Sequence, residues 1–365
     1  MYYDGSRHQI IEKGDRMGSS HKELSPFDYH HKRVRLGKLI FLALSILLAF
    51  SFFLGLSVGA IDIPFNDVIE ILLNSNPNGS IYTKILFDVR LPRVIATLFI
   101  GAALATSGVS LQTLFRNQLA EPYILGIASG ALLGVSIIVA LGVSQQPFGP
   151  YTMSFMAFLG AFLTTFLVYT TSKAFGLRPI SVLLIGLAFS FLLSSIVTFL
   201  QYLALKDIHI IFSWMMGSFS AIHWSHIQIM AVIVPLGLFL LFIKVKDLNA
   251  ILLGEEYAKQ LGVDIKKLTQ YLIIVVAILV SVSVASAGII GFVGLVIPHI
   301  ARLFIGYDNK FLMPASALIG ASFLALADAL SRTIIRPSEL PIGVVTSMIG
   351  APLFIYLLLK RGRGG

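Results

Sequence analysis

Eight long runs of this chain contain no Asp, Glu, Lys or Arg, and this feature limits the possible folds more than any other. A bilayer core about 30 Å thick is crossed by about 20 helical residues, so runs of this length indicate membrane spans. Only 12% of the residues are charged, which excludes a soluble enzyme, a disordered chain and a nucleic-acid-binding protein. The charge-free runs are 39–58, 94–115, 122–172, 179–205, 208–243, 268–301, 311–327 and 340–359.

Two of these runs are too long for a single helix. The run 122–172 contains the turn-forming sequence 143–150, and the run 268–301 is interrupted by glycines and by Pro298. We therefore predict an all-helical membrane protein with about ten spans. The predicted spans are 37–58, 91–114, 122–142, 151–173, 180–204, 226–246, 268–288, 295–306, 312–332 and 340–359.

The positions of the basic residues orient these spans. With the N-terminus inside, 21 of the 27 Lys and Arg residues lie on the inner side and six on the outer side. Inner loops carry such an excess, so we predict a multi-pass protein of the plasma (inner) membrane with both termini cytoplasmic. Spans 1–5 and 6–10 then run in opposite directions, which is the arrangement of two inverted five-helix halves.

Several kinds of chemistry are excluded by missing residue patterns. The chain has no cysteine, so it forms no disulfide and no thiolate zinc site. Its Gly37-Lys38 dipeptide lacks the spacing of a phosphate-binding loop, and its eight histidines include no HExxH pair. We therefore expect no catalytic residues, no ATPase residues, no metal site and no cofactor.

The longest charged interruption between spans is the segment 247–267. It lies within the predicted transmembrane domain, residues 36–360. Polar cytoplasmic tails are predicted on either side of that domain, at 1–35 and 361–365. The part 254–262 of the segment is typical of a short helix between two glycines, and Glu255 and Lys259 are spaced to form an ion pair across one turn. The segment suits docking on a cytoplasmic partner, and the alternative is a helix that only contacts solvent and the membrane surface.

Four arginines are predicted on the outer side, at the ends of spans. Arg90 and Arg93 flank Pro92, which favours a helix start there. Positive charge at a helix start opposes the helix dipole, so a partner carboxylate would explain both arginines. Arg332 and Arg336 follow span 9, and Arg332 has a local alternative partner in Asp328, four residues before it.

Small residues form two smooth helix faces in the first half. Gly126, Gly130 and Gly134 are spaced by four, and Gly101 and Ala105 have the same spacing. Such faces let neighbouring backbones approach closely, so they predict helix packing, with lining of a transport path as the alternative.

Six motifs in order give the chain a resemblance to a known family. They are Arg90-Leu-Pro-Arg93, the run 101–126, Trp214-Met-Met-Gly-Ser-Phe-Ser220, the loop 254–262, Gly291-Phe-Val-Gly-Leu-Val-Ile-Pro-His-Ile-Ala-Arg302 and the run 339–352. With them the chain resembles the FecCD-type permease subunits of type II ABC importers for iron–siderophores, haem and cobalamin, over about residues 37–360. Gln118 and Glu121 depart from the family, which often has Pro and Asp there.

The resemblance implies a set of partners. These are a second permease copy or homologue, two cytoplasmic ATPase subunits, an extracytoplasmic substrate-binding protein and membrane lipid.

The resemblance also implies roles for particular residues. Coupling to the ATPase falls to Gly254, Glu255, Tyr257, Ala258, Leu261 and Gly262, and docking of the binding protein to Arg90, Arg93 and Arg332. The translocation path is expected at Ser190, Ser194, Met215, Gly217, Ser218, Gly343, Thr346 and Ser347.

The cargo is the point that these motifs leave open. We expect import of a bulky metal chelate, with ferric siderophore first and cobalamin or haem as alternatives. A function of another class, an autonomous secondary transporter or channel, is the competing hypothesis. The two classes differ in whether the chain needs an ATP-hydrolysing partner.

Overall fold

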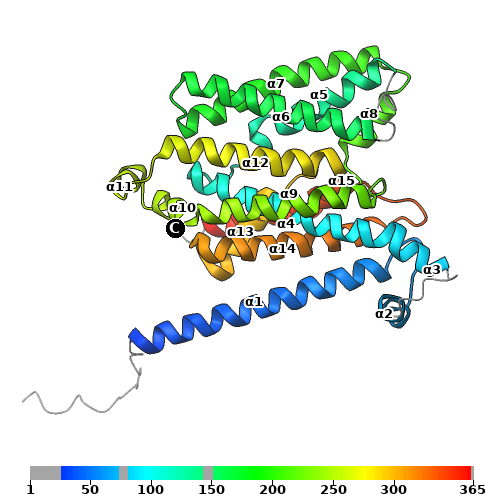
Figure 1. The fold of residues 1–365 in the computed structure, drawn as a ribbon, viewed down its shortest axis with the longest axis horizontal. Coiled ribbons are helices and arrows are strands. Elements are labelled where there is room, and N and C mark those ends of the chain that lie inside the picture. Colours follow the sequence, from blue (N-terminus) through cyan, green and yellow to red (C-terminus); the bar gives the residue numbers. More distant parts are fainter. Residues whose placement is uncertain (1–25, 74–80, 143–150, 363–365) are drawn as a thin grey trace, which may run out of the picture. The chain divides into compact units, whose positions relative to one another are not determined.

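The structure is a computed structural model that describes residues 26–73, 81–142 and 151–362. Within those ranges the chain is helical and has no strand. It divides into two compact units, Met1–Phe41 and Leu42–Gly365, and the boundary lies inside the first helix. The helices (Figure 1) are α1 (Pro26–Ser57), α2 (Phe65–Leu73), α3 (Ile81–Lys84), η1 (Ile85–Arg90), α4 (Leu91–Leu114), η2 (Pro122–Leu125), α5 (Ile127–Ala140), α6 (Thr152–Ala174), α7 (Pro179–Leu203), α8 (Ile208–Met215), α9 (Trp224–Ile243), α10 (Val245–Leu252), α11 (Glu255–Gln260), α12 (Ile265–Ala287), α13 (Val293–Ile305), α14 (Asn309–Ser331) and α15 (Ile342–Gly362).

The predicted all-helical membrane fold is confirmed. Seven helical segments of the described chain are long and apolar enough to cross a membrane, and three shorter apolar helices bring the number to ten. These three are α5, α13 and α15, which stand where spans 3, 8 and 10 are predicted. The turn predicted at 143–150 lies outside the described residues, as do most of the predicted tail 1–35 and residues 363–365.

The start of span 2 differs from the prediction. Helical structure begins at Ile81 and continues to Leu114, with a π-helical turn over Ile85–Arg90. The charge-free run begins only at Val94, because Lys84, Asp88, Arg90 and Arg93 interrupt the apolar sequence. Because of these charged residues, the hydropathy of the sequence does not indicate that the first ten residues of this helix belong to it.

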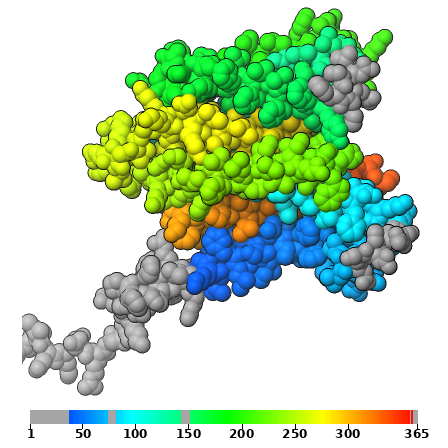
Figure 2. All heavy atoms as spheres, in the orientation of Figure 1, coloured from blue at the N-terminus to red at the C-terminus, as the bar shows by residue number. Residues whose placement is uncertain are grey.

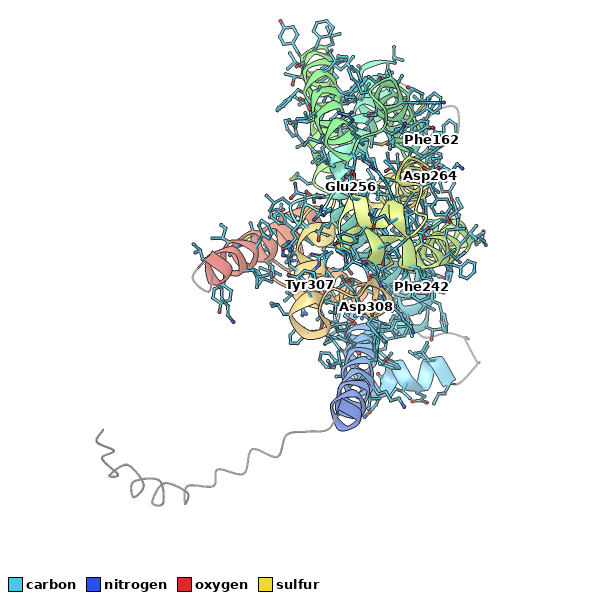
Figure 3. The ribbon with its side chains drawn as sticks, turned by 90° about the vertical axis from the view of Figure 1, so that its left-hand side faces the viewer. Phe162, Phe242, Glu256, Asp264, Tyr307 and Asp308 are labelled. Atoms are coloured by element: carbon cyan, nitrogen blue, oxygen red, sulfur yellow. The ribbon has the colours of Figure 1, made fainter. Side chains whose placement is uncertain are left out.

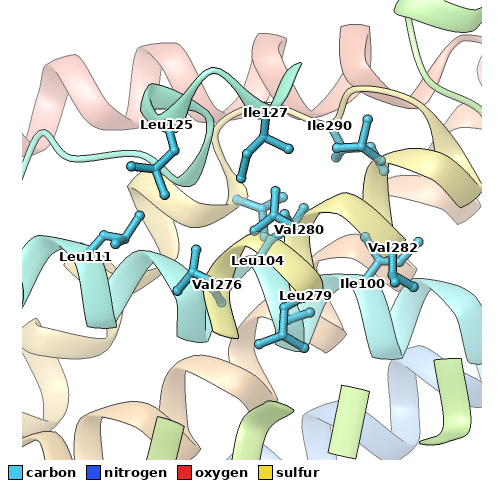
Figure 4. Packing of buried hydrophobic residues seen from close by; sticks show 14 of the residues in the cluster. Ile100, Leu104, Leu111, Leu125, Ile127, Val276, Leu279, Val280, Val282 and Ile290 are labelled. Carbon is cyan, nitrogen blue, oxygen red and sulfur yellow. The ribbon is translucent and has the colours of Figure 1, made fainter. Parts of the chain in front are cut away.

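Helix α4 lies at the centre of the second unit. It packs against α9, α12, α13 and α14, whereas α5, α6 and α7 form a neighbouring group (Figure 1). Helix α12 joins the two groups because it contacts both α4 and α6, and in Figure 2 its yellow atoms lie against the green atoms of that group. The buried core between them contains Ile100 and Leu104 of α4 and Val276 and Leu279 of α12 (Figure 4).

Small residues set the distance between the closest helices. A Cβ atom placed on Gly101 of α4 would lie 2.2 Å from the carbonyl oxygen of Gly320 in α14, so the two backbones touch. On α5, a Cβ atom on Gly134 would lie 2.1 Å from the carbonyl oxygen of Met156 in α6. Helix packing, the first interpretation of both glycine faces, is confirmed.

The third helix of each predicted half is short and begins in the same way. Helices α5 and α13 have 14 and 13 residues, and each follows a residue with a left-handed backbone, Gly126 (φ 78°) and Phe292 (φ 68°). The segments that lead into these two helices also touch, because a carboxylate oxygen of Glu121 accepts from the Phe292 N–H at 3.2 Å. Matching short helices in the two halves are typical of transporters built from inverted repeats.

Candidate functional site

Three arginines and two carboxylates meet near α3, and we call them the arginine cluster: Arg90, Arg93, Asp328, Arg332 and Glu339. Arg93 of α4 donates to Asp328 of α14, with an Nη2–Oδ1 distance of 2.8 Å. Its Nη1 donates to Glu339 at 2.9 Å. Arg332 donates to the other Asp328 oxygen at 3.1 Å, so the local pair that its spacing allows is confirmed. One buried carboxylate thus neutralises arginines from two helices.

The same arginines also hold the end of α1. Arg90 Nη1 donates to the carbonyl oxygens of Leu56 and Ser57 at 2.6 and 2.8 Å, and its Nη2 donates to Ile61. Arg332 donates to the carbonyls of Gly55 and Val58 at 3.0 and 2.8 Å. The last carbonyls of a helix have no partner inside the helix, so two guanidinium groups satisfy those of α1.

The helix-dipole argument for Arg90 and Arg93 is wrong. Both residues lie within a helical segment that begins at Ile81, not at a helix start. Their positive charge is explained by internal partners, namely carbonyl groups of the α1 end for Arg90 and two carboxylates for Arg93. Sequence reasoning missed this because Arg93 and Asp328 are 235 residues apart.

Burial limits how a partner can reach the cluster. Arg90, Arg93 and Arg332 are 4%, 5% and 4% exposed, and the exposed member is Glu339, whose side chain is 36% exposed. Their role in docking stays a prediction. A partner carboxylate would approach Arg93 from the side that Glu339 covers.

Arg336, for which the resemblance gives no role, forms a separate pair at the surface. Its Nη1 and Nη2 donate to the two oxygens of Asp62 at 2.7 and 2.8 Å. These hydrogen bonds lower the pKa of Asp62 below its usual value. The pair is exposed, so it differs from the buried cluster beside it.

The predicted short helix in the charged segment is present as α11. The glycines that bracket it have left-handed backbones, with φ of 120° at Gly254 and 85° at Gly262, which other residues rarely adopt. Tyr257 and Leu261 are 63% and 65% exposed, and Glu255 is exposed as well. They present a mixed apolar and acidic surface at one end of the bundle, where Figure 3 labels Glu256, Asp264 and Asp308.

Two details of this segment differ from the sequence expectation. Ala258 is completely buried, so it packs α11 against its own chain, and the exposed surface of the helix is formed by its neighbours. Lys259 pairs with Glu256 at 3.1 Å, three residues away, rather than with the expected Glu255. Residues three and four apart are both neighbours on a helix surface, so Lys259 can reach either glutamate, and it pairs with Glu256.

The predicted path residues fall into two groups. Gly217 and Gly343 adjoin, since the Ile342 N–H donates to the Gly217 carbonyl at 3.1 Å and the Gly343 N–H to the Met216 carbonyl at 3.0 Å. A Cβ atom on Gly343 would lie 2.6 Å from the Met216 carbonyl oxygen, so the start of α15 touches the end of α8. Met215 and Ser218 belong to the same junction.

The other path residues are placed differently. Thr346 is completely buried in α15, whereas Ser347 is half-buried one residue later. Ser190 and Ser194 lie on α7, which packs on α5, α6 and η2 rather than on α15. Ser194 is exposed, and the Ser190 hydroxyl donates to the Gly186 carbonyl of its own helix. Within one chain, Ser190 and Ser194 of α7 therefore do not lie beside the predicted path residues of α15.

A pocket of about 180 Å³ opens beside α8, and no sequence pattern predicts it. Its walls include Tyr151, Trp214, Ser218, His223 and His226. The two histidines bond to each other's backbone at the start of α9. Among the described residues, no three His, Asp or Glu side chains gather as metal ligands would.

Comparisons with known proteins agree on one family. The model of the FecCD transport family matches residues 47–360. An uncharacterized ABC transporter permease protein of Bacillus subtilis, YvrB, is 39% identical over 87% of this chain and 92% of its own length. The vitamin B12 import system permease protein BtuC of Vibrio parahaemolyticus is 41% identical over 80% and 88%. The hemin transport system permease protein HmuU of Yersinia pestis is 35% identical over 90% and 96%.

Solved structures have the same fold. An inward-facing structure of a metal-chelate type ABC transporter superposes with a TM-score of 0.78 and 33% identity, over 88% of this chain and 99% of that one. PsaBC from Streptococcus pneumoniae superposes with a TM-score of 0.53 over 80% of this chain and 95% of that one. Its identity is 19%, so this second likeness concerns the fold alone.

Proposed function

Since this chain belongs to the FecCD transport family, we propose that it is the membrane-spanning permease subunit of an ATP-binding-cassette importer for a bulky metal chelate. The proposal includes the partners implied by the sequence. They are a second permease copy or homologue, two cytoplasmic ATPase subunits, an extracytoplasmic substrate-binding protein and surrounding lipid.

The observation that carries the proposal is the exposed surface of α11. A helix of six residues, fixed between Gly254 and Gly262, presents Tyr257 and Leu261 at one end of the bundle. Exposed aromatic and aliphatic side chains on a rigid short helix are suited to a groove on another protein. The sequence contains no phosphate-binding loop, so ATP hydrolysis would have to come from that other protein.

A second permease copy is supported by the placement of the path residues. The α7 serines Ser190 and Ser194 and the α15 residues Gly343 and Ser347 do not meet within one chain. Exposed apolar residues continue along both helices, including Phe191 on α7 and Met348 on α15. A path shared between two copies would bring α7 of one copy and α15 of the other to one axis.

The orientation follows from the same assignment. With α11 on the ATPase side, the end of the bundle that carries α2, α3 and the arginine cluster faces outward (Figure 1). Both termini are then cytoplasmic, and the membrane is the plasma (inner) membrane. The distribution of basic residues in the sequence supports this orientation.

The cargo is proposed at the level of its class. Two curated relatives are named for vitamin B12 and hemin, both metal chelates, and a structural neighbour is described as of the metal-chelate type. Ferric siderophore, the first expectation from the sequence, belongs to the same class. Equilibrium binding of cobalamin, hemin and a ferric siderophore to the cognate binding protein would select among the three.

Transport by the reconstituted complex tests the function. Proteoliposomes with this chain, its ATPase and the loaded binding protein are expected to accumulate the chelate when ATP is present. Uptake by this chain alone, driven by an ion gradient and independent of ATP, would instead support the autonomous secondary transporter.

A further inference from the structure

A group of polar side chains lies at the α11 end of the bundle, and we call it the amide cluster: Thr113 and Asn309, which are buried, and Asn249 and Asp308, which are half-buried. The Asn249 side-chain oxygen accepts from the backbone and side-chain nitrogens of Asn309, both at 2.9 Å. Its side-chain nitrogen donates to Asp308 at 2.8 Å. Thr113 donates to the Asn309 side-chain oxygen at 3.2 Å. Every member of the cluster is therefore linked to Asn249 directly or through one residue.

These hydrogen bonds connect three helices. Asn249 belongs to α10, Thr113 to the last turn of α4, and Asn309 is the first residue of α14. Asp308 also accepts from the Lys310 N–H, so it caps α14 while it holds Asn249 (Figure 3 labels Asp308). Asn309 is completely buried, which makes an unpaired N–H there costly. The side chain of Asn249 thus fixes α10 to the adjoining ends of α4 and α14.

Helices α4 and α14, to which Asn249 fixes α10, are joined to each other at two further places. Their backbones touch at Gly101 and Gly320, and the Arg93–Asp328 ion pair joins them again near α3. On the other side, α10 leads into α11 through only two residues, Leu253 and Gly254. Asn249 therefore lies between the exposed helix α11 and the pair α4–α14.

We propose that Asn249 is a positioning residue for transport, which transmits movement of α11 to the α4–α14 pair. The inference rests on the proposed function, in which an ATPase moves α11. Apolar contacts of Leu248 and Ile251 also hold α10, but apolar surfaces can slide, whereas hydrogen bonds have fixed directions. Without the Asn249 bonds, α10 and α11 would tilt together and leave α4 and α14 in place.

The test uses the full complex in proteoliposomes and measures ATP hydrolysis and chelate uptake in parallel. Asn249→Asp removes the donor to Asp308 and places two carboxylates side by side. We expect uptake per ATP hydrolysed to fall about tenfold, the change that the loss of one hydrogen bond to a charged group produces. Asp308→Asn keeps an acceptor for Asn249 and for Lys310, so it should transport nearly as the unchanged chain does.

The double variant Asn249→Asp with Asp308→Asn provides the decisive comparison. It restores the hydrogen bond with donor and acceptor exchanged, so uptake per ATP should recover most of the loss. Lys244→Gln is the matched control, because it removes a half-exposed ion pair with Asp247 beside the same helix. Its ratio of uptake to hydrolysis should not change.

Three results would overturn the inference. One is an unchanged ratio of uptake to hydrolysis in Asn249→Asp. Another is an equal fall of uptake and hydrolysis together with a lower melting temperature, which would make Asn249 a residue of fold stability only. The third is failure of the double variant to recover. If the unchanged complex shows no ATP-dependent uptake, the proposed function fails as well, and this outcome is distinguishable from the other three.

Discussion

Arg93 and Asp328 form a buried ion pair, with 2.8 Å between Nη2 and Oδ1, that joins α4 to α14. The Arg93 and Asp328 side chains are 6% and 1% exposed. Asp328 also pairs with Arg332. The carboxylate charge of Asp328 is therefore shared between Arg332 on its own helix and Arg93 of the first half of the chain. The Arg93–Asp328 pair therefore fixes α4 to α14 at the end of the bundle that carries α2 and α3.

Removal of the Asp328 charge should destabilise the protein strongly. Asp328→Asn leaves Arg93 and Arg332 buried without their shared carboxylate, and loss of one partner of a buried pair costs about 3–5 kcal/mol. Thermal unfolding in detergent measures the effect. Arg336→Gln is the control, because the exposed Asp62 pair is worth only about 0–1 kcal/mol. Equal melting temperatures for the two variants would contradict the prediction.

Glu339 should compete with a docking partner for Arg93. Glu339→Gln removes the competing charge, so the loaded binding protein should dock about two- to fivefold more tightly at low salt, as expected for one rim ion pair. Titration at two salt concentrations measures the affinity, and screening should reduce the gain at high salt. Glu70→Gln on α2 is the control, since it removes an equal charge from an exposed residue that is not among the hydrogen-bond partners of Arg93. Equal affinities for both variants would remove Arg93 from the docking surface.

Charge on the exposed face of α11 should abolish ATP-dependent uptake. Tyr257→Asp with Leu261→Asp places two carboxylates where an apolar contact is expected, and an apolar groove does not accept unpaired charge. Uptake by the complex and copurification of the ATPase are measured together. Leu73→Asp on α2 is the control, an exposed apolar residue at the other end of the bundle. Full uptake by the α11 variant would show that this helix only contacts solvent.

A methyl group at Gly101 should separate α4 from α14. The added Cβ atom of Gly101→Ala would meet the Gly320 carbonyl at 2.2 Å, and a backbone atom cannot move aside as a side chain does. We expect a loss of about 1–3 kcal/mol, typical of overpacking. Gly291→Ala is the control, because no atom lies within 4 Å of its Cβ position. Equal thermal stability of the two variants would contradict a touching helix pair.

The spans could be predicted from the sequence because a charge-free run of sufficient length is a local property. The Asp328–Arg332 pair could be predicted for the same reason, since residues four apart face each other on a helix. The helical start at Ile81 could not, because Arg90 and Arg93, which interrupt the apolar sequence, bond to groups that only the folded chain brings near.

The same distinction between local and long-range information applies to the candidate site residues. The glycines around α11 were predictable, since their backbone conformation is determined by the local turn. The burial of Ala258 and the separation of Ser190 from Gly343 depend on which helices are neighbours, and periodicity does not contain that information. The amide cluster was missed because Thr113, Asn249 and Asn309 are ordinary polar residues until three helices meet.

The distance along the chain between Arg93 and Asp328 has a consequence for biogenesis. At about 5–20 residues per second, the ribosome needs about 12–47 s to add the 235 residues between them. During that time α4 has entered the bilayer and its arginine has no acidic partner from α14. The nascent chain must therefore leave Arg93 at the lipid–water interface or under the protection of the insertion machinery, and the bundle can close at this end only when the ninth span has emerged.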